Sequence, residues 1–290
     1  MRTDQPKVIH LKDYLASDYL IDETHLTFEL HEDHSLVHTQ LVMRRNPDRV
    51  GESADVALPP LVLDGQHLEL VSLFLDDVEL QRSDYVLDEN HLTLQPTAEQ
   101  FVVDTTVRIH PEQNTALEGL YKSGKMFCTQ CEAEGFRKIT YYLDRPDVMS
   151  RFTTTVSGDQ ARYPILLSNG NPIASGSEEG GRHWATWEDP FPKPAYLFAL
   201  VAGDLWCVED SFTTMSGREV ALRIYVEPEN IDKCQHAMDS LKKSMKWDEE
   251  VYGREYDLDI FMIVAVSDFN MGAMENKGLN IFNSSAVLAK

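Results

Sequence analysis

Residues 271–278 combine small side chains with a carboxylate. Gly272 and Ala273 are small enough for another backbone to approach them closely. Glu275 places a negative charge beside that approach. Residues 279–282 predict a strand whose edge can pair with an extended peptide, and the terminal ammonium of that peptide then meets Glu275. The residues alone leave a second interpretation open, a hairpin turn with a solvated glutamate.

The string Gly272-Ala273-Met274-Glu275-Asn276 resembles the exopeptidase signature of the zinc aminopeptidase N family, the gluzincin aminopeptidases. Its flanking residues resemble the bacterial branch of that family. Residues 116–121, 130–135 and 141–146 resemble the family as well. The resemblance therefore covers most of the chain, and it is clearer after residue 116 than before it.

The resemblance implies two carboxylates for the substrate's α-amino group, Glu275 and Glu132, with Gln130 beside them. An ammonium about 4 Å from a carboxylate gains roughly 4 kcal/mol at an effective dielectric near 20, before desolvation. An internal peptide bond offers no ammonium and leaves these charges unpaired, which restricts cleavage to the first residue. The implied substrate-binding residues are Gln130, Glu132, Met271, Gly272, Ala273, Met274, Glu275 and Asn276.

Met271 precedes the signature, and the resemblance implies that it lies beside the pocket for the first side chain. A methionine is flexible and polarisable, so it adapts to side chains of different size. This interpretation fits an enzyme of broad specificity. Ordinary packing in the core is the alternative for the same residue.

The family's zinc is held by two histidines of an HExxH helix and a later glutamate, and the glutamate inside HExxH is the general base. The nearest string here is His31-Glu32-Asp33-His34, whose histidines are three residues apart and lie between two predicted strands. We therefore expect no metal ligand and no catalytic residue within this chain.

On this interpretation the chain is the amino-terminal portion of a zinc metalloaminopeptidase that ends before the zinc motif. Zinc belongs to the full-length parent, and the chain alone is expected to be inactive. A module that binds peptide amino termini without catalysis is the alternative function.

Cys128-Thr129-Gln130-Cys131 is a CxxC motif, which in other contexts is redox-active or half of a zinc site. The sequence has no second CxxC, and Cys207 and Cys234 stand in separate segments. We expect two reduced cysteines in a loop. A thiol or zinc-binding protein remains a third class to test.

Residues up to about 198 predict a mainly β structure. Leu26, Phe28 and Leu30 alternate with polar residues, which is typical of a strand with one buried face. Similar segments occur at 36–43, 61–63, 67–75, 85–87, 92–94, 102–109, 151–156, 163–167 and 183–187. Many short strands separated by turns predict a large β-sandwich or saddle.

The remaining residues predict the start of an α/β domain. Residues 219–226 read as a strand, and apolar residues at steps of three and four predict an amphipathic helix over about 229–252. Residues 260–266 are continuously apolar, as in a strand buried on both faces. We place the boundary near 204: residues 1–204 as a β-saddle domain and 205–290 as the first part of a catalytic domain, thermolysin-like by the resemblance.

The 290 residues carry a formal net charge of −22, which disfavours nucleic acid and anionic lipid as partners. No apolar run is long enough for a signal peptide or a membrane span. Four cysteines in a chain of this length indicate a reducing, cytoplasmic setting. We expect a monomer whose partners are peptides with a free amino terminus.

Overall fold

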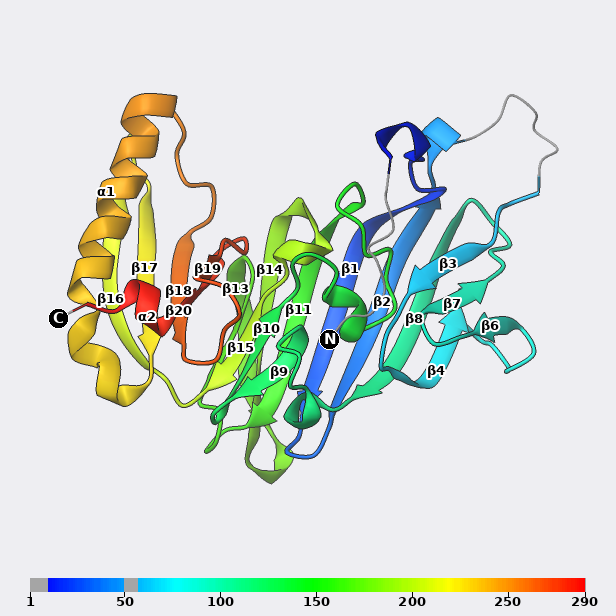
Figure 1. The fold of residues 1–290 in the computed structure, drawn as a ribbon, viewed down its shortest axis with the longest axis horizontal. Coiled ribbons are helices and arrows are strands. Elements are labelled where there is room, and N and C mark those ends of the chain that lie inside the picture. The colour runs from blue at the N-terminus through cyan, green and yellow to red at the C-terminus, as the bar shows by residue number, and fades with distance from the viewer. Residues whose placement is uncertain (1–9, 50–56, 290) are drawn as a thin grey trace.

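The computed structural model describes residues 10–49 and 57–289, which form four β-sheets (Figure 1). Residues 1–9 of the predicted first domain lie outside the described residues. A five-stranded sheet covered by the helix α1 stands at one end, and a three-stranded sheet stands at the other (Figure 1). The prediction of a mainly β structure that ends in the start of an α/β unit is confirmed.

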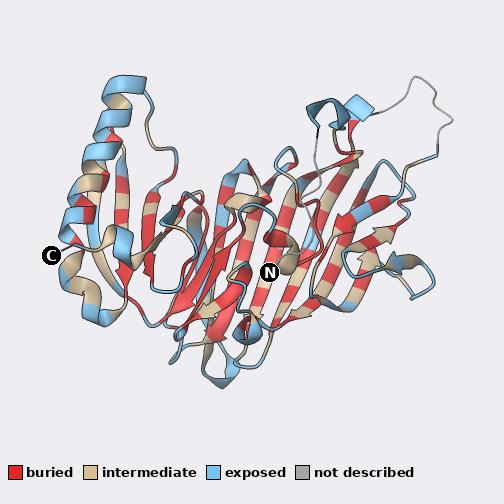
Figure 2. Cartoon of the chain, in the orientation of Figure 1, coloured by how far each residue is buried: buried red, intermediate tan, exposed pale blue. Residues whose placement is uncertain are grey.

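The largest sheet has eight strands, with β1 and β11 parallel and the other pairs antiparallel. Leu26, Phe28 and Leu30 in β1 are buried and alternate with more exposed neighbours, as predicted. Figure 2 shows the same striping along the central strands. The order across the sheet is β13 (Asn171–Glu178), β14 (Arg182–Pro194), β11 (Met149–Asp159), β1 (Tyr19–Leu30), β2 (Ser35–Arg45), β8 (Gln100–Ile109), β4 (Glu69–Leu75) and β5 (Val78–Glu79).

Two smaller sheets contribute to the core beside the eight-stranded sheet. One is β3 (Leu61–Asp64), β7 (His91–Leu94) and β6 (Tyr85–Leu87), and the other is β12 (Ile165–Ser168), β15 (Leu200–Gly203), β10 (Met126–Gln130) and β9 (Gly119–Ser123). Their apolar side chains join those of the eight-stranded sheet in one cluster. Phe136 and Phe198 lie in this cluster with ring centroids 5.2 Å apart. The sheets that pack around this shared core are the layers of the predicted sandwich.

Strand β10 is buried on both faces. Phe127 packs into the first core, whereas Met126 and Cys128 pack into a second core shared with the five-stranded sheet. A strand of this kind shows no alternation of polar and apolar residues, which explains why the sequence did not reveal it. The expectation that both cysteines of the CxxC lie in a loop is wrong for Cys128, which is a strand residue.

The five-stranded sheet has the order β16 (Trp206–Thr213), β17 (Glu219–Val226), β18 (Ile260–Val266), β20 (Leu279–Asn283) and β19 (Ala273–Met274). Met262 and Val264 of β18 face the second core, and Ile263 faces a third core beneath α1. Residues 260–266 are thus buried on both faces, as predicted.

The helix predicted over about 229–252 is a 3-10 turn, Pro228–Lys233, followed by α1 (Gln235–Tyr252). Met238, Leu241 and Met245 form its buried stripe. A short helix, α2 (Ser284–Val287), follows β20. The other 3-10 turns are Leu11–Asp13, Pro47–Arg49, Pro111–Gln113, Phe136–Lys138, Glu179–Gly181 and Ala195–Leu197. Of the described helices, none combines the length and apolarity that crossing a membrane requires.

Candidate functional site

The segment predicted to bind substrate lies at an open edge of the five-stranded sheet. β19 pairs with β20 through Ala273 opposite Phe282 and Met274 opposite Ile281. β20 also pairs with β18, so both of its edges are used within the sheet. The expectation that the edge of residues 279–282 is free for a peptide is therefore wrong, because the chain folds β19 onto that edge. Among the described strands, the free edge here belongs to β19.

Burial alternates along the signature. Met274 is fully buried in the second core, Glu275 is exposed, and Asn276 is buried at 2% exposure. The side chains on either side of Glu275 thus anchor the backbone, and the carboxylate projects outward. A Cβ atom placed on Gly272 would contact no described residue within 4 Å, so the face beside Gly272 is open to an approaching chain.

Gln130, from the predicted first domain, contacts the residue that precedes the signature. It ends β10, it is 2% exposed, and its Nε2 atom lies 3.9 Å from the Sδ atom of Met271. The same Nε2 donates to the carbonyl of Glu132 at 3.3 Å. Its buried Oε1 has no hydrogen-bond partner among the described residues. Gln130 and Met271, which are 141 positions apart, are therefore in contact, and Gln130 retains an unused acceptor.

Glu132 and Glu275 are both exposed carboxylates. Within the described parts of the chain, neither carboxylate takes part in a hydrogen bond or ion pair. Glu132 lines a cavity of about 300 Å³ together with Glu134 and Lys138. Glu134 is instead paired with Arg137 at 3.6 Å. The two predicted amine-binding carboxylates thus differ from this neighbouring glutamate, which has a cationic partner.

The loop before the signature is fastened to β9 and its flanking turn. Ser123 Oγ donates to Asp268 Oδ2 at 2.9 Å, and the hydroxyl of Tyr121 donates to the Asp268 carbonyl at 2.9 Å. Asn270 Nδ2 donates to the carbonyl of Ala116 at 3.2 Å. Sequence reasoning missed these contacts, because each joins residues about 145 or more positions apart.

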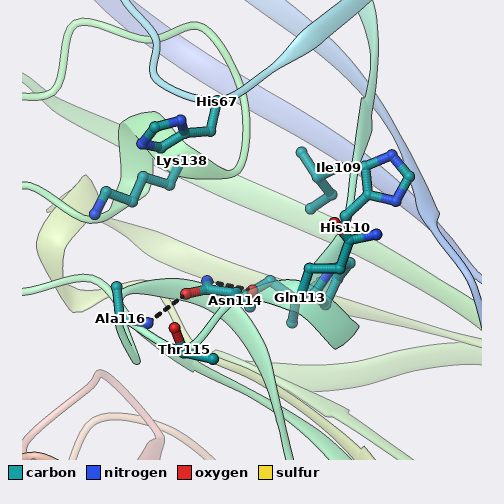
Figure 3. Close-up of a pocket in the computed structure, with 10 residues that line it drawn as sticks. His67, Ile109, His110, Gln113, Asn114, Thr115, Ala116 and Lys138 are labelled. Atoms are coloured by element: carbon teal, nitrogen blue, oxygen red, sulfur yellow. Dashed lines mark hydrogen bonds between the residues drawn. The ribbon is translucent and has the colours of Figure 1, made fainter.

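The turn that receives Asn270 also borders a surface cavity of about 410 Å³ (Figure 3). In this view His67 and Lys138 form one wall and His110 the other. Lys138 is already paired with Glu118, and His110 contacts Glu112 at 3.1 Å. Since these basic groups have acidic partners, we assign no ligand to this cavity.

The CxxC pair is reduced and inaccessible. Cys128 and Cys131 are free cysteines, and both are buried. Burial raises the pKa of the Cys128 thiol to about 12 and also raises the pKa of Cys131. Because the thiolate is the reactive form of cysteine, a raised pKa makes both thiols poor nucleophiles at pH 8.

We therefore expect Cys128 and Cys131 to resist iodoacetamide at pH 8 in the native protein and to react once guanidinium unfolds it. Peptide mapping by mass spectrometry gives the modified fraction of each cysteine. Cys207, which is half-buried, is the internal comparison. Rapid native labelling of either CxxC thiol would instead support a thiol-based function.

Comparison with known proteins shows the family to which this chain belongs. The family model described as the peptidase M1 N-terminal domain matches residues 55–197, and the model of the peptidase family M1 domain matches residues 236–290. The chain belongs to the M1 peptidase family.

Several proteins similar to this chain come from bacteria. Over its full length the chain is 55% identical to aminopeptidase N of Caulobacter vibrioides, and over 99% of its length it is 54% identical to aminopeptidase N of Escherichia coli. A solved structure of Legionella pneumophila aminopeptidase A, in complex with aspartic acid, covers 96% of the chain with a TM-score of 0.91 and 36% identity. The chain spans 32% of the length of each of these proteins.

Proposed function

We propose that this chain supplies the amine-binding part of an aminopeptidase that releases amino-terminal residues from peptides. The contact between Gln130 and Met271 is the observation on which the proposal depends. Glu132 lies two residues after Gln130, and Glu275 lies four residues after Met271. The contact thus joins the two segments that contain the unpaired carboxylates. The relatives named as aminopeptidases support the same activity.

Electrostatics gives this arrangement its selectivity. Two carboxylates in one site repel each other, and a bound ammonium relieves that repulsion. The open edge of β19 can add the peptide as a further strand, with the backbone of Gly272 and Ala273 aligning it. A peptide segment without a free amine leaves both charges uncompensated, which costs binding free energy. The site therefore selects the first residue of a chain.

The M1 family implies zinc in the full-length protein. In the described part of this chain, no group of three or more His, Cys, Asp or Glu residues is placed to hold a metal ion. We assign none of the described residues as a zinc ligand. Our proposal for this chain is limited to substrate binding and alignment.

We propose a division of the chain near residue 204 into the β-saddle and the start of the catalytic domain. β15 ends at Gly203 and β16 begins at Trp206 in a different sheet, which supports this division. We also propose a cytoplasmic, monomeric enzyme. The four free cysteines support a reducing compartment.

Acetylation of the ligand's amine tests the proposed function. In the enzyme that contains this chain, an amino-acid amide is expected to inhibit peptide hydrolysis at least about tenfold more tightly than its N-acetyl derivative, because only the free amine is an ammonium. Inhibition constants measured at pH 7 give the ratio. The Glu132→Gln variant is expected to reduce it. Equal inhibition by both compounds would rule out amine recognition.

A further inference from the structure

The turn that links the four-stranded sheet to the eight-stranded sheet contacts the carboxyl side of the signature. Asn169 lies between β12 and β13 and is 3% exposed. Its Nδ2 donates to the carbonyl of Lys277 at 2.8 Å and to that of Leu197 at 3.0 Å. Its Oδ1 accepts from the amide of Ala199 at 2.8 Å. One buried amide thus ties the residue after Asn276 to the first part of the chain.

The backbones touch beside this bond. Gly278 has φ +77°, and a Cβ atom there would lie 3.1 Å from the amide nitrogen of Gly170. Gly170 has φ +89°, and a Cβ on it would lie 2.0 Å from the carbonyl oxygen of Glu188. Both positions therefore favour glycine. A side chain at Gly278 would push against the backbone of Gly170, and one at Gly170 would collide with the backbone of Glu188 in β14.

The side chain of Lys277 is held as firmly as its backbone. Its Nζ lies 2.6 Å and 2.5 Å from the two carboxylate oxygens of Asp257. It also stands 4.7 Å from the ring centroid of Phe191, in the proline-rich end of β14. Lys277 is thus held by Asn169 and Phe191, which precede the division near residue 204, and by Asp257, which follows it.

Glu275 depends on this attachment. Its carboxylate has no partner among the described residues, so no side-chain contact there compensates for a shift of the backbone. Pairing of β19 with β20 fixes the residues before it, and burial of Asn276 fixes the residue after it. The bond from Asn169 then holds this segment against the residues before 204, among which Glu132 lies in the turn that follows β10.

We propose that Asn169 is a positioning residue. It holds the backbone around Glu275 in the position from which the Glu275 carboxylate binds the same ammonium as Glu132. This inference rests on the proposed amine-binding function. Asn169 does not touch the substrate in this proposal, because its bonds are all internal. A misplacement of about 1 Å in a binding group can cost roughly 100-fold in rate, so a single remote amide is able to influence activity.

Asn169→Asp in the complete enzyme tests the proposal. Aspartate keeps the acceptor for Ala199 but presents an oxygen instead of an N–H donor to the carbonyls of Lys277 and Leu197. We expect KM for peptides with a free amine to rise about three- to tenfold with a smaller change in kcat, because amine binding is weakened. Asn169→Ser, which is too short to reach Lys277, is expected to act in the same direction and serves if the aspartate variant does not fold.

Asn171→Ala is the matched control. Asn171 is the first residue of β13, directly after this turn, and it also contacts the residues after 204. Its partner there is Asp259, whose amide donates to Asn171 Oδ1 at 3.0 Å. This variant removes a contact of the same kind without touching the signature. Its KM is expected to stay within twofold of the wild type. Near-UV circular dichroism confirms the fold of each variant.

A double-mutant cycle with Glu275→Gln separates positioning from general damage. If Asn169 acts through Glu275, Asn169→Asp changes KM little once the carboxylate at 275 is absent. The same rise in KM in both backgrounds would overturn the positioning role, as would wild-type KM in folded Asn169→Asp and Asn169→Ser. If Glu275→Gln itself leaves KM and kcat unchanged, it is the proposed function that fails.

Discussion

Replacing Glu275 by glutamine in the enzyme that contains this chain is expected to lower kcat/KM for free-amine peptides by about 2–4 kcal/mol, roughly 30- to 1000-fold. Glutamine keeps the shape of the side chain and removes its charge. The carboxylate is exposed and has no partner among the described residues, so the substitution breaks no internal contact. The loss therefore reports the interaction with the substrate's ammonium.

Glu134→Gln is the control for this experiment. Glu134 is an exposed glutamate that borders the same cavity as Glu132, but it is paired with Arg137. Its substitution is expected to change kcat/KM less than about threefold, as surface ion pairs contribute about 1 kcal/mol or less. Steady-state kinetics on one free-amine substrate compares the variants. An unchanged kcat/KM for Glu275→Gln excludes it from amine binding.

The second large effect concerns the stability of β14. Lys193 and Asp189 are both buried, and Nζ lies 3.1 Å from Asp189 Oδ2 and 3.8 Å from the ring centroid of Phe152. Removing one partner leaves the other charge buried without compensation, which typically costs about 3–5 kcal/mol. Lys193→Met is therefore expected to lower the free energy of unfolding by about that amount. Asp189→Asn is expected to act in the same direction.

Guanidinium unfolding monitored by near-UV circular dichroism measures the loss. The double variant Asp189→Asn, Lys193→Met has no buried charge at either position and is expected to recover most of the stability. If the double variant is as unstable as the sum of the single variants, the pair does not act as a unit. The result also bears on the site, because Asp189 Oδ1 accepts from the amide of Phe191 at 3.2 Å, and Phe191 covers Lys277.

The buried lysine of this pair makes the free energy of unfolding depend on pH. Burial lowers the pKa of Lys193 from its ordinary value of 10.5 to about 8. Between these two values the unfolded chain keeps a proton that the folded chain has released. The contribution of Lys193 to the free energy of unfolding therefore increases with pH from about 8 to about 10.5 and is smallest below that window. The stability gap between the wild type and Lys193→Met is expected to widen accordingly.

Alternation of polar and apolar residues predicted the strands that have one buried face. β1, with Leu26, Phe28 and Leu30, is the clearest example. The same reasoning failed at both extremes of burial. β10 is buried on both faces and β13 is exposed along most of its length, so neither shows a period of two. Pairing with neighbours distant in the sequence makes these segments strands.

The sequence by itself determined the family signature at 272–276, the apolar patterns of β1 and β18, and the acidic charge. These are local properties, because each depends on residue types at short spacing. Only the tertiary structure decided that β19 covers the edge of β20, that Gln130 meets Met271, and that Asn169 holds Lys277. Such contacts join residues up to 141 positions apart, and their geometry depends on how three separate cores pack together.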